Sequence, residues 1–175
     1  MEPLLTPRFT LTRLAEHDWP FFLQLRQDAG IMRYMSEIAP AEAIRAQFEH
    51  RLQPWVPGAA HPLDFIIRAH GDDTPLGHIG LRHGEQGPDV AEVGYTVAVA
   101  AQGRGVAGEA LRALCEFAFR HTPIQLLKAV IVAENSASGR VLEKNGFRRT
   151  AVIKESYPLH GRVYDDWVYQ LAREG

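Results

Sequence analysis

The stretch from Val93 to Leu111 constrains the fold of this chain more than any other, because its character changes twice within it. Residues 93–99 alternate bulky and small side chains as a strand does, residues 102–105 are rich in glycine, and an amphipathic helix follows. At such a junction the first backbone N–H groups of the helix lack partners, and the helix dipole adds positive potential. Gly103 and Gly105 would keep side chains away from those amides. The junction therefore suits a phosphate or pyrophosphate group.

The same stretch excludes two common phosphate-binding loops. No lysine followed by a hydroxyl residue closes the loop, so it is not the P-loop of nucleotide hydrolases. Gly103, Gly105 and Gly108 do match G-x-G-x-x-G, but they lie far from the start of the chain and follow strands that resemble hairpins. From the loop alone, a plain glycine-rich turn stays open as the alternative.

The order of motifs along the chain is more specific than any one of them. A Glu-Val-Gly-Tyr strand at residues 92–95 precedes Gln102-x-x-Gly105-x-Ala107, and Asn-Ser-Ala-Ser at 135–138 precedes Glu-Lys-Asn-Gly-Phe at 143–147. In this order the motifs resemble the acyl-coenzyme A loop and the next motif of the GNAT superfamily of N-acetyltransferases. Residues 5–14 resemble the start of its RimJ/RimL branch, which acetylates protein N-termini. The likeness runs from about residue 5 to about residue 171.

The resemblance implies one α/β domain over residues 1–175. Its sheet would be mixed, mostly antiparallel and twisted, with helices on both faces and a central parallel strand pair that splays apart after the Gly94–Tyr95 region. The residue pattern agrees, since it predicts strands at 8–14, 63–68, 76–82, 90–98, 126–133, 147–155 and 164–171, and helices from 19, from 40, over 106–121 and from 136. The apolar run 126–133 predicts a central strand covered on both faces. Asp18 is predicted to cap the first helix and Gly30 to end it.

Composition restricts the cellular compartment and the partners that we expect for this chain. A net charge of −2 gives no general attraction to nucleic acid or to an anionic membrane, and the chain has no long apolar run. The first residues do not form a secretory signal, and a single cysteine, Cys115, fits a reducing cytoplasm. Cys115 lies beside leucines in a helical pattern and is interpreted as a buried structural thiol. The histidines lack the spacing of a metal site, so we expect no metal.

The resemblance implies acetyl-CoA as the cosubstrate and assigns residues to it. Backbone groups around Val97 and Val99 would contact the pantetheine arm, and Asn135 would contact the cofactor. The pyrophosphate would lie on Gln102, Gly103, Arg104, Gly105, Val106, Ala107 and Gly108. For Arg104 a solvated side chain without a ligand remains the alternative.

Two residues are candidates for catalysis. Glu92 is the candidate general base, because alternation puts it on the opposite strand face from Val93 and the carboxylate would line a cleft. The alternative for Glu92 is a buried ion pair with Arg68 or Arg82. Ser138 is the candidate proton donor to the departing thiolate, since Leu142 occupies the position where many family members carry a tyrosine. The alternative for Ser138 is an ordinary helix-start serine.

The acceptor side is less defined by the sequence. Tyr34, Phe48 and Trp55 are candidates for substrate contact, with plain core packing as the alternative for each. Glu155 is a reserve base and Tyr157 a substrate contact, from a loop at residues 157–162 that would overhang the entrance.

The predicted function is transfer of acetyl from acetyl-CoA to a primary amine by direct attack in a ternary complex. The acceptor would be a protein N-terminus or a small-molecule amine; a peptide predicts an open groove, and a small amine predicts an enclosed acidic pocket. A non-catalytic acyl-CoA-binding or sensing module is the alternative from another class. The protein is expected to be a monomer or a homodimer.

Overall fold

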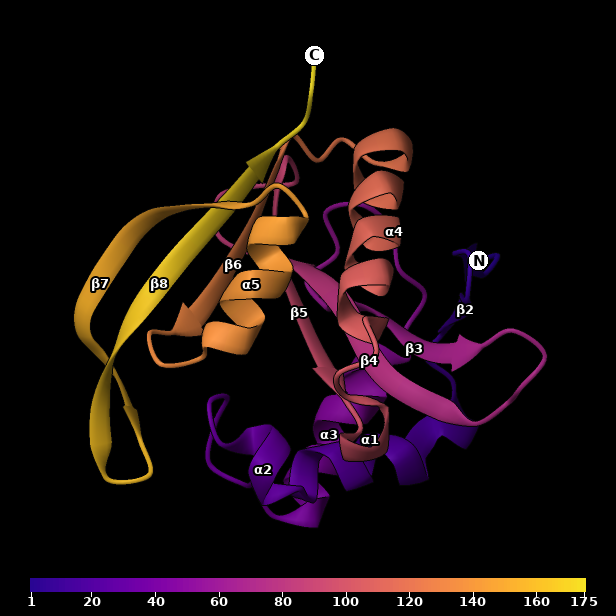
Figure 1. Ribbon diagram of the computed structural model, residues 1–175. Coiled ribbons are helices and arrows are strands. Elements are labelled where there is room, and N and C mark those ends of the chain that lie inside the picture. The colour runs from indigo at the N-terminus through magenta and orange to yellow at the C-terminus, as the bar shows by residue number, and fades with distance from the viewer.

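The computed structural model describes residues 1–175 and shows an eight-stranded sheet in the order β1-β2-β3-β4-β5-β6-β8-β7 (Figure 1). The strands are β1 (Leu4–Leu5), β2 (Phe9–Arg13), β3 (Leu63–Ala69), β4 (Pro75–His83), β5 (Val90–Val97), β6 (Leu126–Val132), β7 (Arg148–Leu159) and β8 (Arg162–Ala172). All neighbouring strands are antiparallel except β5 and β6, which are parallel. The predicted fold class, a mixed and mostly antiparallel sheet with a central parallel pair, is confirmed.

Helices cover both faces of this sheet. They are α1 (Trp19–Gln27), α2 (Ala29–Met32), α3 (Ala41–Arg51), α4 (Val106–His121) and α5 (Ser136–Lys144), with 3₁₀ turns at Glu16–Asp18 and Val99–Ala101. Figure 1 shows α1 to α3 grouped together, apart from α4 and α5. No helix has both the length and the apolar character needed to cross a membrane.

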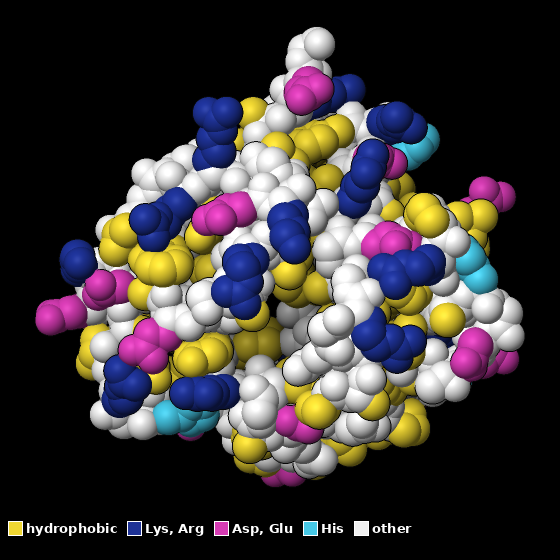
Figure 2. Space-filling view, viewed as in Figure 1, with side chains coloured by type: hydrophobic (Ala, Val, Ile, Leu, Met, Phe, Trp, Pro, Cys, Tyr) yellow, Lys and Arg dark blue, Asp and Glu magenta, His cyan; other side chains and the backbone are white.

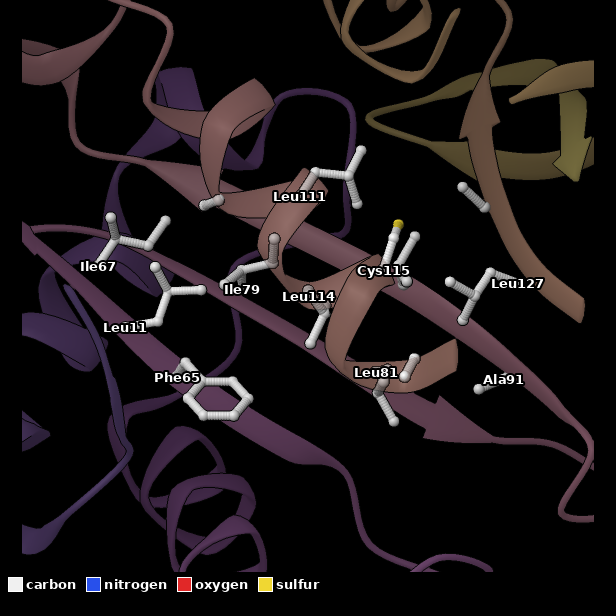
Figure 3. Packing of buried hydrophobic residues seen from close by; sticks show 14 of the residues in the cluster. Leu11, Phe65, Ile67, Ile79, Leu81, Ala91, Leu111, Leu114, Cys115 and Leu127 are labelled. Carbon is white, nitrogen blue, oxygen red and sulfur yellow. The ribbon is translucent and has the colours of Figure 1, made fainter. Parts of the chain in front are cut away.

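Strand β3 shows how two cores form on one sheet. Phe65 and Ile67 belong to the larger core, which packs against α4, whereas Ile66 between them belongs to the core of α1 and α3. Successive side chains of a strand point to opposite faces, so a strand buried on both faces must be apolar at nearly every position. Figure 3 shows the larger core, in which Leu111 and Leu114 of α4 belong to the same cluster as Phe65 and Ile79 of the sheet.

The parallel pair separates almost as soon as it forms. Only Val90, Ala91 and Glu92 of β5 pair with β6, and the last pair joins Glu92 to Lys128. The strands therefore part from Val93 onward, earlier than the Gly94–Tyr95 region that the resemblance implied. Beyond that point β5 keeps its partner β4, and β6 keeps its partner β8. A gap consequently opens in the middle of the sheet.

This separation corrects the prediction for β6. Leu127 and Ala129 are buried, but Val130 is 38% exposed, so the strand is not covered on both faces. The apolar run predicted that β6 would be buried on both faces. After Lys128, however, β5 no longer pairs with β6. The face of β6 that includes Val130 is only partly covered, since Val132 on the same face is buried.

Three predicted boundaries also differ from the structure. The Asp18 side chain does not cap α1; it accepts hydrogen bonds from the Ala15 amide and from Arg68. Gly30 does not end α1, because α1 stops at Gln27 and Gly30 lies inside α2. The expected loop at 157–162 is mostly strand, and β7 and β8 meet at a tight turn in which His160 and Gly161 have positive φ.

Candidate active site

A cleft of about 1030 Å³ occupies the gap between β5 and β6 and extends to the starts of α4 and α5. Figure 2 shows a hollow near the middle of the molecule, with Lys and Arg side chains beside it. The hollow is produced by the parted strands, since their last shared pair is Glu92 with Lys128. The cleft thus lies where the sheet lacks a continuous ladder.

The start of α4 faces this cleft without a cap. Gly103 and Gly105 have φ of 74° and 76°, and no side chain caps the helix. A Cβ at Gly103 would meet nothing within 4 Å, so the loop is open to solvent there. Six of the predicted cofactor residues line the cleft here: Gln102, Gly103, Gly105, Val106, Ala107 and Gly108. Unpartnered amides at an open helix start are a binding site for an anion.

The structure places two other predicted cofactor residues outside the cleft. Val97 lines the cleft, but Val99 does not; it begins a 3₁₀ turn and is 60% exposed. The exposed Arg104 does not line the cleft either, and its carbonyl accepts a hydrogen bond from Arg8 at 3.0 Å. Arg8 also bonds to Glu109 at 2.8 Å and so ties the loop to the first turn of α4.

Helix α5 supplies two cations that the sequence reasoning missed. Arg140 and Lys144 are four residues apart, so they lie on one helix face, and both line the cleft. Asn135 also lines it while its Oδ1 accepts from the Ser138 amide at 3.3 Å, which caps α5. Their i, i+4 spacing on a predicted helix was the sequence signal that could have identified this pair of cations. With the start of α4, these cations make one end of the cleft a fit for a diphosphate such as that of coenzyme A.

Ser138 is paired with a tyrosine that the sequence reasoning did not assign to the site. Its Oγ lies 2.8 Å from the hydroxyl oxygen of Tyr95, which also donates to the Ser138 carbonyl at 3.2 Å. Burial raises the pKa of Tyr95 to about 12, so its hydroxyl is neutral and can donate. Both residues line the cleft, and so does Leu142, which has no exposed surface of its own.

Glu92 lies at the point where the strands part. Its side chain is 36% exposed, lines the cleft and forms a loose ion pair with Arg82 at 3.5 Å. The buried ion pair considered for Glu92 does not occur, because Arg82 is itself 64% exposed and Arg68 binds Asp18 instead. An exposed pair at that distance contributes little to stability and leaves the carboxylate available.

The acceptor end of the cleft is bounded by aromatic and acidic side chains. Tyr34 and Tyr157 line it; Tyr34 packs edge-on against Tyr164, and the Tyr157 hydroxyl donates to the Met35 carbonyl. Asp166 also lines the cleft and accepts a hydrogen bond from Ser156 at 2.7 Å.

Other residues considered for substrate contact lie elsewhere. Glu155 is exposed, has φ of 47° and is not part of the lining. Phe48 is fully buried among aromatic rings, and Trp55 stacks on His83 at 6.0 Å, so both have the packing role considered for them.

A buried polar cluster forms the floor on the α1–α3 side. Asp64 of β3 accepts from His78 Nε2 at 2.7 Å and from Arg51 at 3.1 Å. A Cβ on Gly80 would lie 2.4 Å from the Asp64 carboxylate, so only glycine fits there. The sequence gave no direct signal for this cluster, because Asp64 and His78 lie inside strands otherwise predicted from their apolar residues.

The charge states in this cluster follow from its contacts. Burial would raise the pKa of Asp64, but His78 and Arg51 outweigh it and bring that pKa to about 2. Burial lowers the pKa of His78, Asp64 opposes the shift, and Arg26 and Arg51 add to it; the net shift is downward, which favours the neutral imidazole near pH 7. A neutral imidazole still donates its Nε2 hydrogen to Asp64.

Comparisons with known proteins agree with this geometry. A family described as Acetyltransferase (GNAT) domain matches residues 8–148. The uncharacterized N-acetyltransferase YnaD of Bacillus subtilis (strain 168) is 25% identical over 171 residues, which cover 98% of this chain and 97% of YnaD.

Two solved structures have the same fold at low sequence identity. RimL, a ribosomal-protein alpha-N-acetyltransferase in complex with coenzyme A, has a TM-score of 0.83 and 19% identity, with 98% of each chain covered. Spermidine N-acetyltransferase from Vibrio cholerae, in complex with CoA and spermine, has a TM-score of 0.83 and 18% identity, with 94% of this chain and 95% of that chain covered.

Proposed function

The chain belongs to the GNAT acetyltransferase family, and we propose that it transfers acetyl from acetyl-CoA to a primary amine by direct attack in a ternary complex. The proposed acceptor is a protein or peptide N-terminal amine, or a small-molecule amine. One observation carries the proposal: a single cleft contains the uncapped start of α4 at one end and the Glu92 carboxylate at the other. The two structural relatives, which are named for a protein N-terminus and for spermidine, both act on amines.

The donor end of the cleft is proposed to bind the cofactor diphosphate. The amides of Val106, Ala107 and Gly108 would donate to it, and Arg140 and Lys144 would neutralise its charge. Acetyl-CoA itself supplies a thioester that is already activated for acyl transfer. Val97 and Asn135 line the path between the diphosphate end and Glu92. Fixing both reactants in one cleft is worth about 7–11 kcal/mol of the activation barrier in favourable systems.

Glu92 is proposed to accept the proton of the attacking amine. Its ion pair with Arg82 is exposed and weak, so the carboxylate is free to accept a proton. The carboxylate would take the proton directly or through one water molecule.

Ser138 is proposed to stabilise the departing thiolate by donating a hydrogen bond, with help from Tyr95. The Tyr95 hydroxyl has a single hydrogen, and when it is donated to Ser138 Oγ instead of the Ser138 carbonyl, the serine O–H is free to donate into the cleft. A thiol has a pKa near 8.5, so the thiolate leaves readily, and a hydrogen bond from the serine O–H is enough to stabilise it until it takes a proton from solvent. A covalent route through Cys115 is not proposed, because burial, followed by the charge of Glu116, raises the pKa of that thiol to about 12.

Release of free coenzyme A with a panel of peptides and small amines tests the proposal, together with Glu92→Gln. Loss of a general base lowers turnover about 10²–10⁴-fold, and coenzyme A affinity should stay as in the wild type. Glu116→Gln is the matched control, since Glu116 is an exposed carboxylate on α4 paired with Arg112. Unchanged turnover in Glu92→Gln would remove Glu92 from the proposed role. Stabilisation by coenzyme A without turnover of any amine would instead identify a binding module.

A further inference from the structure

The floor of the cleft on the α1–α3 side carries an excess of positive charge. Arg26, Arg51 and His78 surround a single carboxylate, that of Asp64. The neutral form of His78 is favoured near pH 7, because burial and the two arginines lower its pKa against the attraction of Asp64. Two guanidinium groups thus face one carboxylate, which gives the floor a net charge of about +1. This is the opposite of the acidic pocket that the sequence led us to expect for a small cationic amine.

Arg26 is the residue responsible for the excess. Its guanidinium lies 4.8 Å from the centre of the Phe22 ring, and that of Arg51 lies 5.9 Å from the same ring. Arg51 binds Asp64, but Arg26 has no hydrogen bond to any residue and no acidic partner. Burial and the charge of Arg51 lower the pKa of Arg26 to about 10, against the attraction of Asp64.

Two other half-buried arginines, Arg13 and Arg68, are satisfied internally, whereas Arg51 binds Asp64 but keeps a buried Nε without a partner. Arg13 donates to the carbonyls of Arg51, Gln53 and Asp64, and Arg68 binds Asp18. A guanidinium partly removed from water without an acceptor carries a free-energy cost that a bound anion would remove. Arg26 lies in the last turn of α1, where the negative end of the helix dipole stabilises a cation. The dipole does not, however, provide a hydrogen-bond acceptor for the guanidinium in the cleft.

A second observation points to a ligand at the same place. The Thr96 hydroxyl is buried, lines the cleft and has no partner in the chain. In the strand register Thr96 lies directly opposite His78, so both point to the face on which Asp64 lies. The floor therefore combines an unpaired cation with an unsatisfied hydroxyl.

The strands set the distance from this floor to Glu92. Gly80 lies opposite both Asp64 and Gly94, and Gly94 is two residues from Glu92. Neither glycine carries a side chain into the space between Glu92 and the Asp64 cluster. With about 3.3 Å per residue along a strand and about 4.8 Å between strands, the separation is on the order of 10 Å. That span exceeds the distance between amine and carboxylate within one α-amino acid.

We propose that Arg26 binds an anionic group, a carboxylate or a phosphate, of an acceptor whose amine reaches Glu92 across a floor in which Asp64 lies on the order of 10 Å from Glu92. This inference rests on the proposed acetyl transfer and names its substrate class: an amine that also carries an acid several bonds from the nitrogen. A short peptide with an acidic residue near its N-terminus has that form, and so does a long ω-amino acid. Polyamines do not.

The test is a set of matched acceptors assayed by coenzyme A release. Short peptides carry one glutamate at the second, third or fourth residue, and each is paired with its glutamine counterpart. Phosphoserine peptides, an ω-amino acid and spermidine complete the panel, so that the source of the anion is distinguished. Each acceptor is assayed with the wild type, Arg26→Gln and Arg26→Lys. Arg112→Gln is the control, because it removes the same charge from an exposed site on α4.

In the wild type, at least one acidic acceptor should exceed its neutral counterpart tenfold or more in kcat/KM, chiefly through KM. Arg26→Gln should raise KM for that acceptor at least tenfold and leave kcat, the neutral acceptors and coenzyme A affinity unchanged. Arg26→Lys should restore part of the preference, and Arg112→Gln should keep all of it. Equal rates for acidic and neutral acceptors, a preference for spermidine, or an equal loss on every acceptor in Arg26→Gln would overturn the inference.

A binding measurement separates this inference from the proposed function. If no amine is turned over, the acetyl transfer proposal fails, and thermal shifts with the N-acetylated acidic peptides still report on Arg26. Stabilisation of the wild type but not of Arg26→Gln would retain the anion site. Equal shifts in both proteins would overturn it.

Discussion

Replacing Gly103 by alanine tests the idea that bare backbone at the start of α4 binds the cofactor. Gly103 has φ of 74° and lines the cleft, and a Cβ there would meet no protein atom within 4 Å. The protein itself thus has room for the methyl group. The change should act in two separable ways, through backbone strain and through the approach of the diphosphate.

The strain can be sized from the backbone. An alanine in the left-handed region costs roughly 1–2 kcal/mol, and in a domain of this size 1 kcal/mol shifts Tm by about 2–4 °C. We therefore expect Gly103→Ala to lower Tm by about 2–8 °C. Charge-assisted hydrogen bonds are worth about 1.5–3 kcal/mol, so loss of one to the diphosphate should weaken coenzyme A binding about 10- to 100-fold.

Gly71→Ala is the matched control. Gly71 has φ of 72°, a Cβ there would also meet nothing within 4 Å, and it lies in the turn between β3 and β4, outside the cleft. It should show the same loss of Tm with coenzyme A affinity unchanged. The assay is thermal unfolding for stability and isothermal titration calorimetry for the affinity.

Two results would refute the reasoning. Affinity within twofold of the wild type in Gly103→Ala would show that a side chain at the bend does not obstruct the ligand. Equal weakening in Gly103→Ala and Gly71→Ala would show that backbone strain, not the approach of the ligand, controls binding.

Three further predictions concern the charge cluster, the thiol and the core. The pKa of Asp64 is about 2 against 3.8 for a free carboxyl, so its ionisation contributes about 2 kcal/mol that is present above pH 4 and lost as pH falls toward 2. Urea unfolding at several pH values should show the stability gap between the wild type and Asp64→Asn narrowing by that amount in this window, and a constant gap would contradict the assignment. Cys115, with a pKa of about 12, should react with a thiol reagent only after denaturation, and rapid reaction in the native protein would show that it is accessible. Leu111→Ala, at a fully buried site, should lower the free energy of unfolding by about 2–5 kcal/mol, whereas a loss below 1 kcal/mol would mean that the core of α4 is loosely packed.

The sequence alone determined the elements whose signals are local. The bounds of α4 at Val106 and His121 follow from the glycine-rich loop before it and the apolar stripe along it, and Pro123 stops the chain from continuing as helix. The turn signals between residues 63 and 98 predicted the three-stranded meander for the same reason. These features depend on neighbouring residues, so their signal lies in short windows of sequence.

Residues that line the cleft could be predicted from the sequence only where a single motif contains them. Gln102 to Gly108 lie on one loop and helix start, and all of them but Arg104 line the cleft; their role in binding the cofactor stays a prediction. Arg104 and Val99 do not line it, because sequence position does not fix the direction in which a side chain points. Tyr95 and Ser138 are far apart along the chain, and no local pattern indicated that their hydroxyls meet.

Only the tertiary structure decided what the acceptor end contains. Arg26 and Arg51 come from the ends of two helices and Asp64 and His78 from two strands, and each has an ordinary local context. Their charge balance became visible once β3, β4, α1 and α3 were packed together. The early separation of β5 and β6 is also a property of the whole sheet, because it depends on which neighbour each strand keeps. Local sequence thus determined the glycine-rich loop before α4, whereas long-range packing determined the cleft and the charge balance of its floor.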